Sequence, residues 1–182
     1  MLNMKSIHKL FFAFVAVILT VAVFTGCGED RRSSSSRKDE AAAIPEAPTG
    51  LFLDLAEVFS PEEEEMLSET IRNFEAKTGG QLRVLTVETT GNFPIEEFSL
   101  DVVNKWKLGY EGKGNCVLLT LAIGDHRDRI EVGRSWESVL TDVRCGEILR
   151  SIVPELRAEQ YAEACAKAVR SLEAFFPENE AH

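Results

Sequence analysis

Apolar residues recur at helical spacing over a stretch that begins at Ser60 and ends at Gly79-Gly80. Serine can cap a helix, the proline that follows it suits a first turn, and Glu63 can complete a capping box with the serine. The glycine pair ends the pattern, because glycine readily adopts the left-handed conformation found after helices. The spacing therefore predicts a helix between these signals, with an apolar face made of Phe59, Leu67, Ile71 and Phe74.

Three other segments have the patterns of strands. Gln81 to Thr89 is rich in β-branched and aliphatic residues, which favour a strand. Cys116 to Ile123 is apolar apart from Thr120, as expected for a central strand covered on both faces. After a turn at Gly124 to Asp128, the segment Arg129 to Gly133 alternates and predicts a hairpin partner nearer the sheet edge. The predicted sheet is therefore small and mixed.

Three further helices are predicted. One starts at Asn92-Phe93-Pro94 and is closed by Gly109. The next begins near Thr141-Asp142 and ends before Pro154, and the last runs from about Glu155 to Phe175. With the first helix this makes about four helices, placed on both sides of the sheet. The order of elements predicts an α/β fold, a three-layer α/β/α sandwich.

The first 27 residues have the features of an export signal. Lys5 and Lys9 precede an apolar run from Leu10 to Phe24, which is shorter than the roughly 20 residues of a spanning helix. Phe24-Thr25-Gly26-Cys27 resembles the lipobox of bacterial lipoproteins. That resemblance implies cleavage before Cys27 and a lipid on its sulfur. The alternative is an uncleaved membrane anchor with an incidental cysteine.

The rest of the chain divides by composition. Residues 28–49 contain a serine run, alanines and two prolines. Their apolar surface is too small to offset the conformational entropy lost on ordering, so a disordered tether is expected. Residues 50–176 are predicted to form the domain, followed by a tail at 177–182. Removing residues 1–27 takes away two lysines and no acids, so 18 basic and 30 acidic residues leave a net charge of −12. Such an acidic surface argues against nucleic acid as a partner.

Cysteines and histidines give little sign of catalysis. Cys116, Cys145 and Cys165 each lie in an apolar pattern and are expected in the core. A disulfide between Cys145 and Cys165 stays open as an alternative, because sequence does not fix the required geometry. His126, which lies in a polar turn, is interpreted as a solvated turn residue. We therefore predict no catalytic residue.

Several segments of the domain, in this order and spacing, resemble the TPM domain family. They are Asp54 with Leu55 to Ser60, Thr78-Gly79, Trp106-Lys107-Leu108-Gly109, Gly114 to Leu119, Arg129 to Gly133, Glu137, Leu140-Thr141-Asp142 and Arg157 to Tyr161. The resemblance implies an α/β/α sandwich in an extracytoplasmic, membrane-attached setting. With Gly28 after the lipobox cysteine, it favours the outer membrane facing the periplasm in a cell with two membranes. Family members are linked to photosystem repair, receptor modulation, acid phosphatase activity and divalent-metal binding.

Oxygen-bearing side chains suggest a weak cation site. We expect Asp54 and the loops after two strands to converge at one end of the sheet, where open α/β sheets place ligands. The candidates for Ca²⁺ or Mg²⁺, which prefer oxygen, are Asp54, Asn115, Glu131, Glu137 and Asp142. Gly114 and Cys116 replace the family's usual Asp and Gly around Asn115, which argues against strong binding. The alternative is that Asp142 caps a helix and the other residues are surface charges.

Two functions are consistent with these sequence features. The first is a non-enzymatic, lipid-anchored adaptor that supports a protein complex at the cell envelope through the loop face around Asn115 and Glu131 to Asp142. Trp136 is a candidate partner contact on that face, or else folds back onto the domain. The second is a divalent-metal-dependent phosphatase on the same face. The substitutions at Gly114 and Cys116 favour the adaptor.

Overall fold

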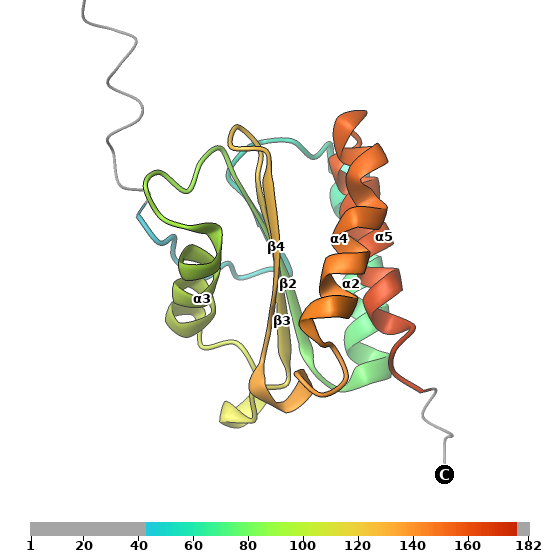
Figure 1. Ribbon diagram of the computed structural model, residues 1–182. Helices are drawn as coiled ribbons and strands as arrows, with labels where there is room; N and C mark the ends of the chain where they lie inside the picture. Colours follow the sequence, from blue (N-terminus) through green and yellow to red (C-terminus); the bar gives the residue numbers. More distant parts are fainter. Residues whose placement is uncertain (1–42, 178–182) are drawn as a thin grey trace, which may run out of the picture. The chain divides into compact units, whose positions relative to one another are not determined.

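The computed structural model describes residues 43–177 and has helices on both faces of a four-stranded sheet (Figure 1). The elements are β1 (Phe52–Asp54), α2 (Pro61–Thr78), β2 (Gln81–Val87), α3 (Ile95–Trp106), η1 (Tyr110–Gly112), β3 (Cys116–Ala122), β4 (Arg127–Val132), η2 (Arg134–Trp136), α4 (Asp142–Arg157) and α5 (Tyr161–Glu173). The predicted α/β/α sandwich with a mixed sheet is confirmed. The predicted signal peptide and Cys27 lie outside the described residues.

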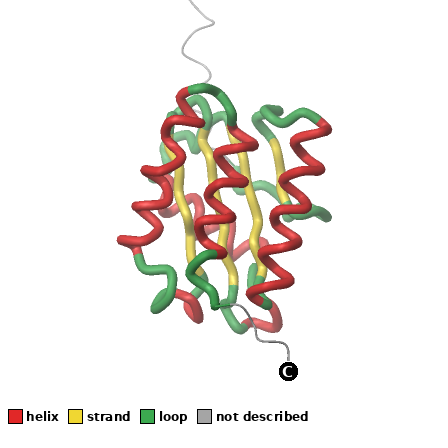
Figure 2. Tube along the Cα trace, turned by 90° about the vertical axis from the view of Figure 1, so that its right-hand side faces the viewer, coloured by secondary structure: helices red, strands yellow, loops and turns green. Residues whose placement is uncertain are grey.

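The strands follow one another across the sheet in chain order. β1, β2 and β3 are parallel, and β4 is antiparallel to β3. α3 covers one face, whereas α2, α4 and α5 lie side by side on the other (Figures 1 and 2). Because α2 and α3 connect successive neighbouring strands on opposite faces, their two crossovers have opposite hand. One of them is therefore the uncommon left-handed type, since such connections are nearly always right-handed.

Alternate strand residues divide between two cores. Leu119 and Ile130, which pair across β3 and β4, pack in the larger core under α2, α4 and α5. Leu85 and Leu118 belong to the smaller core under α3. All seven residues of β3 are buried, as predicted for a central strand. The sheet is therefore covered on both sides around β3, which fixes its register.

The predicted signals at both ends of α2 are confirmed. The Ser60 side chain accepts a hydrogen bond from the Glu63 backbone at 3.4 Å, and the Glu63 carboxylate accepts one from the Ser60 backbone at 2.8 Å. Gly79 ends the helix with φ of 69° and donates its N–H to the Glu75 carbonyl. These contacts satisfy backbone groups that a helix end leaves without partners.

Two local predictions differ from the structure. The predicted helix end before Pro154 is wrong, because α4 continues through Pro154 to Arg157. The predicted start of the last helix at about Glu155 is wrong for the same reason, and α5 begins at Tyr161. Proline removes one hydrogen bond, and so close to the C-terminus the helix retains most of its remaining bonds. The chain turns instead at Glu159, which has φ of 58°. β1 was not predicted, since three residues are too few to show an alternating pattern.

The chain just before the domain lies against α3. The Trp106 indole donates a hydrogen bond to the Pro45 carbonyl at 2.9 Å, and the Lys105 ammonium donates one to the Ile44 carbonyl at 2.7 Å. Lys105 also pairs with Glu46 at 2.8 Å. This part of the predicted tether is therefore held in place. Within residues 43–177, no helix has the length and apolarity to cross a bilayer.

Candidate functional site

The sheet has two edges at which loops gather. We call the edge where β2 and β3 begin and β4 ends the amino edge, and the edge where β1, β2 and β3 end the carboxyl edge; they lie at the bottom and top of Figure 1. Asp54 ends β1 at the carboxyl edge, whereas Asn115 precedes β3 at the amino edge. The expected convergence of Asp54 with the other candidates is wrong. The physical reason is that β4 is antiparallel, so the loop after β4 leaves at the opposite edge from the loop after β1.

Two of the candidate ligands already have partners in the protein. The Asp54 carboxylate accepts a hydrogen bond from the Phe59 backbone at 2.9 Å and another from the Thr86 hydroxyl. These contacts hold the loop between β1 and α2. Glu131 accepts a charged hydrogen bond from Arg129 at 2.9 Å, two residues away on the same side of β4. Both carboxylates therefore have structural roles.

Asn115 connects two loops of the amino edge. Its side-chain oxygen accepts a hydrogen bond from the Tyr110 backbone at 3.1 Å, and its side-chain nitrogen donates one to the Gly79 carbonyl at 2.9 Å. A further hydrogen bond at this edge joins the loops before β3 and after β4, because the Ser135 hydroxyl donates to the Lys113 carbonyl. The amide of Asn115 thus stabilises the loop arrangement.

Glu137 and Asp142 are exposed at the same edge. Asp142 is the first residue of α4, in the turn where a carboxylate complements the helix dipole. The helix is capped by Thr141, whose side chain accepts from the Arg144 backbone at 3.4 Å. In the part of the chain that the structure describes, no three His, Cys, Asp or Glu side chains group closely enough to hold a metal ion. The five predicted ligands do not fit a shared cation site.

Trp136 is a core residue, so the exposed partner contact is wrong and the alternative, that it folds back onto the domain, is confirmed. Its side chain is 8% exposed, and its ring centroid lies 5.9 Å from that of Phe74 and 4.7 Å from that of Phe176. The short helix η2 turns the indole inward beneath α2 and α5. Gly80 leaves the space that the indole occupies. Gly80 is far from Trp136 in the chain, so the sequence did not indicate this contact.

Two apolar side chains at the amino edge are exposed instead. Tyr110 in η1 is 43% exposed, and Val143 in the first turn of α4 is 68% exposed. Val143 does not share the buried face of α4, to which Cys145 and Ile148 belong. Neither residue was predicted from the sequence, although helical spacing from Cys145 and Ile148 places Val143 off the buried face of α4.

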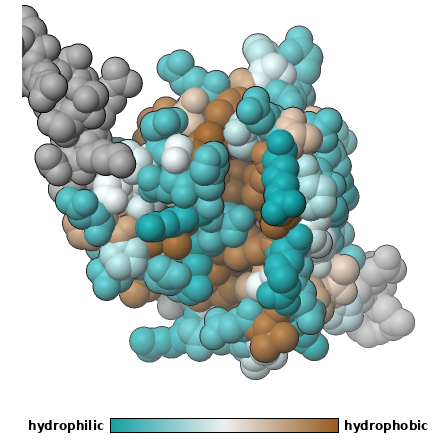
Figure 3. Space-filling model, turned by 45° about the horizontal axis from the view of Figure 1, so that its top comes forward, coloured by the Kyte–Doolittle hydropathy of each residue, from teal (hydrophilic) through white to brown (hydrophobic). Residues whose placement is uncertain are grey.

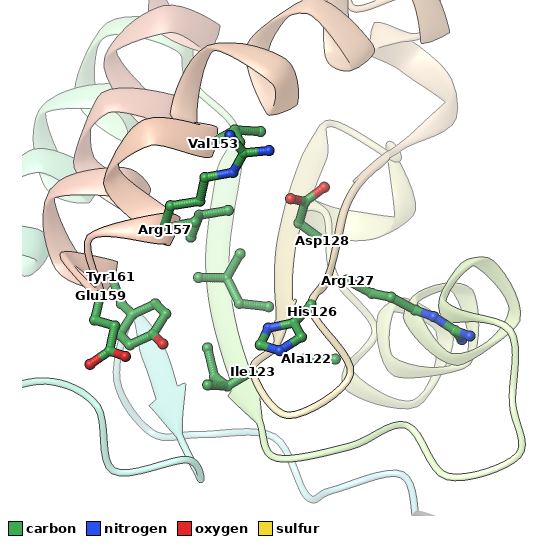
Figure 4. Close-up of a pocket in the computed structure, with 11 residues that line it drawn as sticks. Ala122, Ile123, His126, Arg127, Asp128, Val153, Arg157, Glu159 and Tyr161 are labelled. Carbon is green, nitrogen blue, oxygen red and sulfur yellow. The ribbon is translucent and has the colours of Figure 1, made fainter.

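The carboxyl edge is hollowed on both sides of the β3–β4 hairpin. The first hollow, which we call the hairpin hollow, has a volume of about 540 Å³ and lies between the hairpin and the ends of α4 and α5. A second hollow of about 780 Å³ lies toward the start of α3. A view toward this edge shows apolar surface within a hollow between hydrophilic side chains (Figure 3). The hairpin hollow is lined by Leu121, Ala122, Ile123, His126, Arg127, Asp128, Val153, Leu156, Arg157, Glu159 and Tyr161 (Figure 4).

The hairpin turn itself is fastened to the neighbouring loop by Asp125. Its carboxylate accepts hydrogen bonds from the Thr90 backbone at 2.8 Å and the Thr89 hydroxyl at 2.9 Å. Burial alone would raise the pKa of Asp125, but these hydrogen bonds and the charge of Arg127 outweigh it and lower the pKa. His126 follows in the left-handed conformation, with φ of 53°, and is exposed. These hydrogen bonds therefore hold the turn in place, and the side chains that come after it extend from a fixed position.

A family model for the TPM domain matches residues 52–175, from the start of β1 to the end of α5. The chain belongs to the TPM domain family. The match covers every strand and helix of the described structure, so the family assignment includes both edges of the TPM domain.

Solved structures share the fold of this TPM domain. The N-terminal domain of a Porphyromonas gingivalis (P. gingivalis) protein is 27% identical with a TM-score of 0.65, over 74% of this chain and 88% of that chain. The N-terminal domain of a Corynebacterium glutamicum protein is 16% identical with a TM-score of 0.60, over 75% and 86%. A protein from Bizionia argentinensis is 24% identical with a TM-score of 0.55, over 67% and 86%. The comparison with curated proteins gave no match.

The three cysteines of the TPM domain are buried free thiols. Burial raises the pKa of Cys116 and Cys145, and nearby carboxylates add to the effect. Cys165 is fully buried, and its pKa is raised most strongly, again by burial first. A raised pKa disfavours the thiolate, which is the reactive and metal-binding form. The thiols therefore fill space in the core.

Proposed function

We propose that this TPM-domain protein is a lipid-anchored adaptor that binds a protein partner at the cell envelope through its amino edge. The observation that carries the proposal is the exposure of Tyr110 and Val143 on an edge whose loops are fixed by hydrogen bonds. Exposed tyrosine on a rigid surface is typical of protein-binding sites, where it contributes strongly to affinity.

The rigidity of the amino edge supports this use. The Gly133 backbone donates to the Cys116 carbonyl at 2.8 Å, and the Ser135 backbone donates to the Gly114 carbonyl at 3.3 Å. Together with the Asn115 amide, these bonds connect the loops before β3 and after β4. A surface that is already ordered loses less conformational entropy when a partner binds.

Charged residues are also exposed at the amino edge. Lys113, Arg134, Glu137 and Asp142 are all exposed at this edge. Protein interfaces usually combine exposed apolar side chains with polar and charged ones. The proposed roles of Glu137 and Asp142 are therefore contacts to a partner, in place of the metal ligation first considered.

The setting of the adaptor rests on the N-terminal sequence. The lipobox-like segment ending at Cys27 supports a lipid anchor on that residue, and the acidic composition supports a protein partner over nucleic acid. We place the anchor in the outer membrane facing the periplasm where the cell has two membranes.

Site-specific photo-crosslinking in cells tests the proposal. A photoreactive amino acid is placed in the full-length chain at position 110, at position 143 or, as a matched control, at Leu100 on α3, which is 48% exposed. We expect a discrete crosslinked product from positions 110 and 143 that is absent from position 100. Equal products from all three positions, or none from the amino edge, would contradict the adaptor.

A further inference from the structure

β4 places a carboxylate on the side of the sheet that faces the larger core. Ile130 belongs to that core and Val132 packs against it, and residues two apart on a strand share a face, so Asp128 lies on the same side. Asp128 pairs across the hairpin with Leu121, which is buried. Asp128 therefore holds a position that the alternation of the strand assigns to an apolar residue.

The helix layer ends beside Asp128 and leaves the hairpin hollow open. α4 stops at Arg157, and α5 starts at Tyr161 after a turn through Glu159. The volume of about 540 Å³ lies within the range of small-molecule sites, roughly 300–1,000 Å³. Val153 adds apolar surface from α4. The hollow thus combines an apolar wall with the charged Asp128.

Asp128 and Arg157 enter the hollow from opposite walls, one from β4 and the other from α4 (Figure 4). Within residues 43–177 neither side chain takes part in a hydrogen bond or an ion pair. By contrast, Asp54 and Asp125, the other aspartates at this edge, accept hydrogen bonds from the protein. Burial raises the pKa of Asp128, as expected for a carboxylate removed from water without a compensating cation.

We propose that the hairpin hollow binds a small zwitterion of the amino-acid or short-peptide class, with its ammonium on Asp128 and its carboxylate on Arg157. The planar guanidinium of arginine matches a carboxylate in two parallel hydrogen bonds. Asp128 repels a simple anion, and Arg157 repels a simple cation. A ligand that carries both charges therefore satisfies both walls, and its apolar part lies against Val153 and Leu156.

This site is independent of the adaptor surface, because it lies at the carboxyl edge and the proposed partner surface lies at the amino edge. Tyr110 and Val143, the exposed residues of the proposed partner surface, do not line the hollow. The binding test below and the crosslinking test above can therefore fail separately.

Titration calorimetry on the full-length protein in detergent tests the ligand class. The probes are L-alanine, L-leucine and L-alanyl-L-alanine, compared with butylamine and butyrate, which carry one charge each. We expect at least one zwitterion to bind about tenfold or more tightly than either single-charge probe. The preference between free amino acids and the dipeptide reports the distance that separates the two charges when bound. Absence of zwitterion binding, or equal binding of butyrate or butylamine, overturns the proposal.

Substitutions then assign the two charges. Asp128→Asn and Arg157→Gln are each expected to weaken zwitterion binding about tenfold or more. The matched controls are Asp101→Asn on α3 and Arg72→Gln on α2, two exposed residues outside the hollow, which should bind as the wild type does. Far-UV circular dichroism confirms the fold of each variant, and Arg157 is exposed, so its variant is expected to fold. Unchanged affinity in either hollow variant overturns the assignment.

Discussion

The indole of Trp136 occupies the space beside Gly80 so closely that a Cβ atom at position 80 would lie 2.0 Å from the Cη2 atom of Trp136. It would also lie 2.7 Å from the Asn115 carbonyl oxygen, which belongs to the backbone. The residue before β2 and the short helix η2 after β4 are therefore in direct contact, and separating them would expose the indole.

Gly80→Ala is expected to destabilise the domain by about 1–3 kcal/mol, because the added methyl group overpacks the indole and the Asn115 backbone. Chemical denaturation followed by tryptophan fluorescence measures the change. Gly50→Ala is the control, since the nearest atom to its added Cβ is 4.0 Å away. Equal stabilities for the two variants would contradict the contact.

Leu119→Ala is expected to destabilise the domain by about 2–5 kcal/mol through the cavity it leaves. Leu119 is fully buried in β3, with Val84 on one side and Ile130 on the other. The midpoint of urea unfolding gives the change. Leu100→Ala on the exposed surface of α3 serves as the control and should alter the midpoint little.

Asp125 makes stability depend on acid pH. Its folded-state pKa is lowered, so its stabilising effect is complete above the ordinary value of about 3.9 and is lost as pH falls through the folded-state pKa. Asp125→Asn should be less stable than the wild type at pH 7 by about 1–3 kcal/mol, because it removes a charged acceptor from Thr90. Unfolding free energies at several pH values should show this difference shrinking below pH 4. A difference that stays constant down to strongly acid pH would contradict the role of the charge.

The thiols of Cys116, Cys145 and Cys165 should react slowly in the folded protein. All three are buried and free, and their raised pKa values disfavour the thiolate. Alkylation followed by mass spectrometry should show little modification of these residues before unfolding and full modification afterwards without a reductant. A requirement for reductant would instead show a disulfide.

Cys27→Ala tests the proposed anchor. Because the lipid is attached to Cys27 before cleavage in the lipobox scheme, the variant should retain its signal peptide and take up no labelled fatty acid. Metabolic labelling and the intact mass measure both effects. Cys116→Ala, a substitution of a buried thiol in the domain, should leave both unchanged.

The predictions that are confirmed most closely depend on residues near one another in the chain. Ser60, Glu63 and Gly79 defined both ends of α2, because capping depends on residues close together in the chain. The continuous apolar run of β3 indicated a strand buried on both faces, and all its residues are buried. A strand buried on both faces requires helices on both sides of the sheet, which is the layered arrangement observed.

Features that depend on residues far apart in the chain were not predicted from the sequence. The burial of Trp136 depends on Phe74 and Phe176 and on the missing side chain at Gly80, none of which is its neighbour in the chain. Asp54 was expected to converge with the other candidate ligands, but they lie at the opposite edge, because β4 runs antiparallel and the loop after it leaves at the amino edge. In the same way, Asp128 and Arg157 enter one hollow only because α4 folds back over the hairpin.

The order of the strands also has a consequence for how the chain folds as it emerges during synthesis. In the described sheet, β2, β3 and β4 each pair with the strand just before them in the chain, so no strand has to be inserted between two that are already joined. Pairing between strands that are consecutive in the chain requires a shorter connection to close than pairing between strands further apart in the chain. β1 and α2 are complete before β2 appears, and each later strand extends a free edge of the growing sheet. This domain can therefore be assembled from its N-terminal end onward, in the direction in which a ribosome releases it.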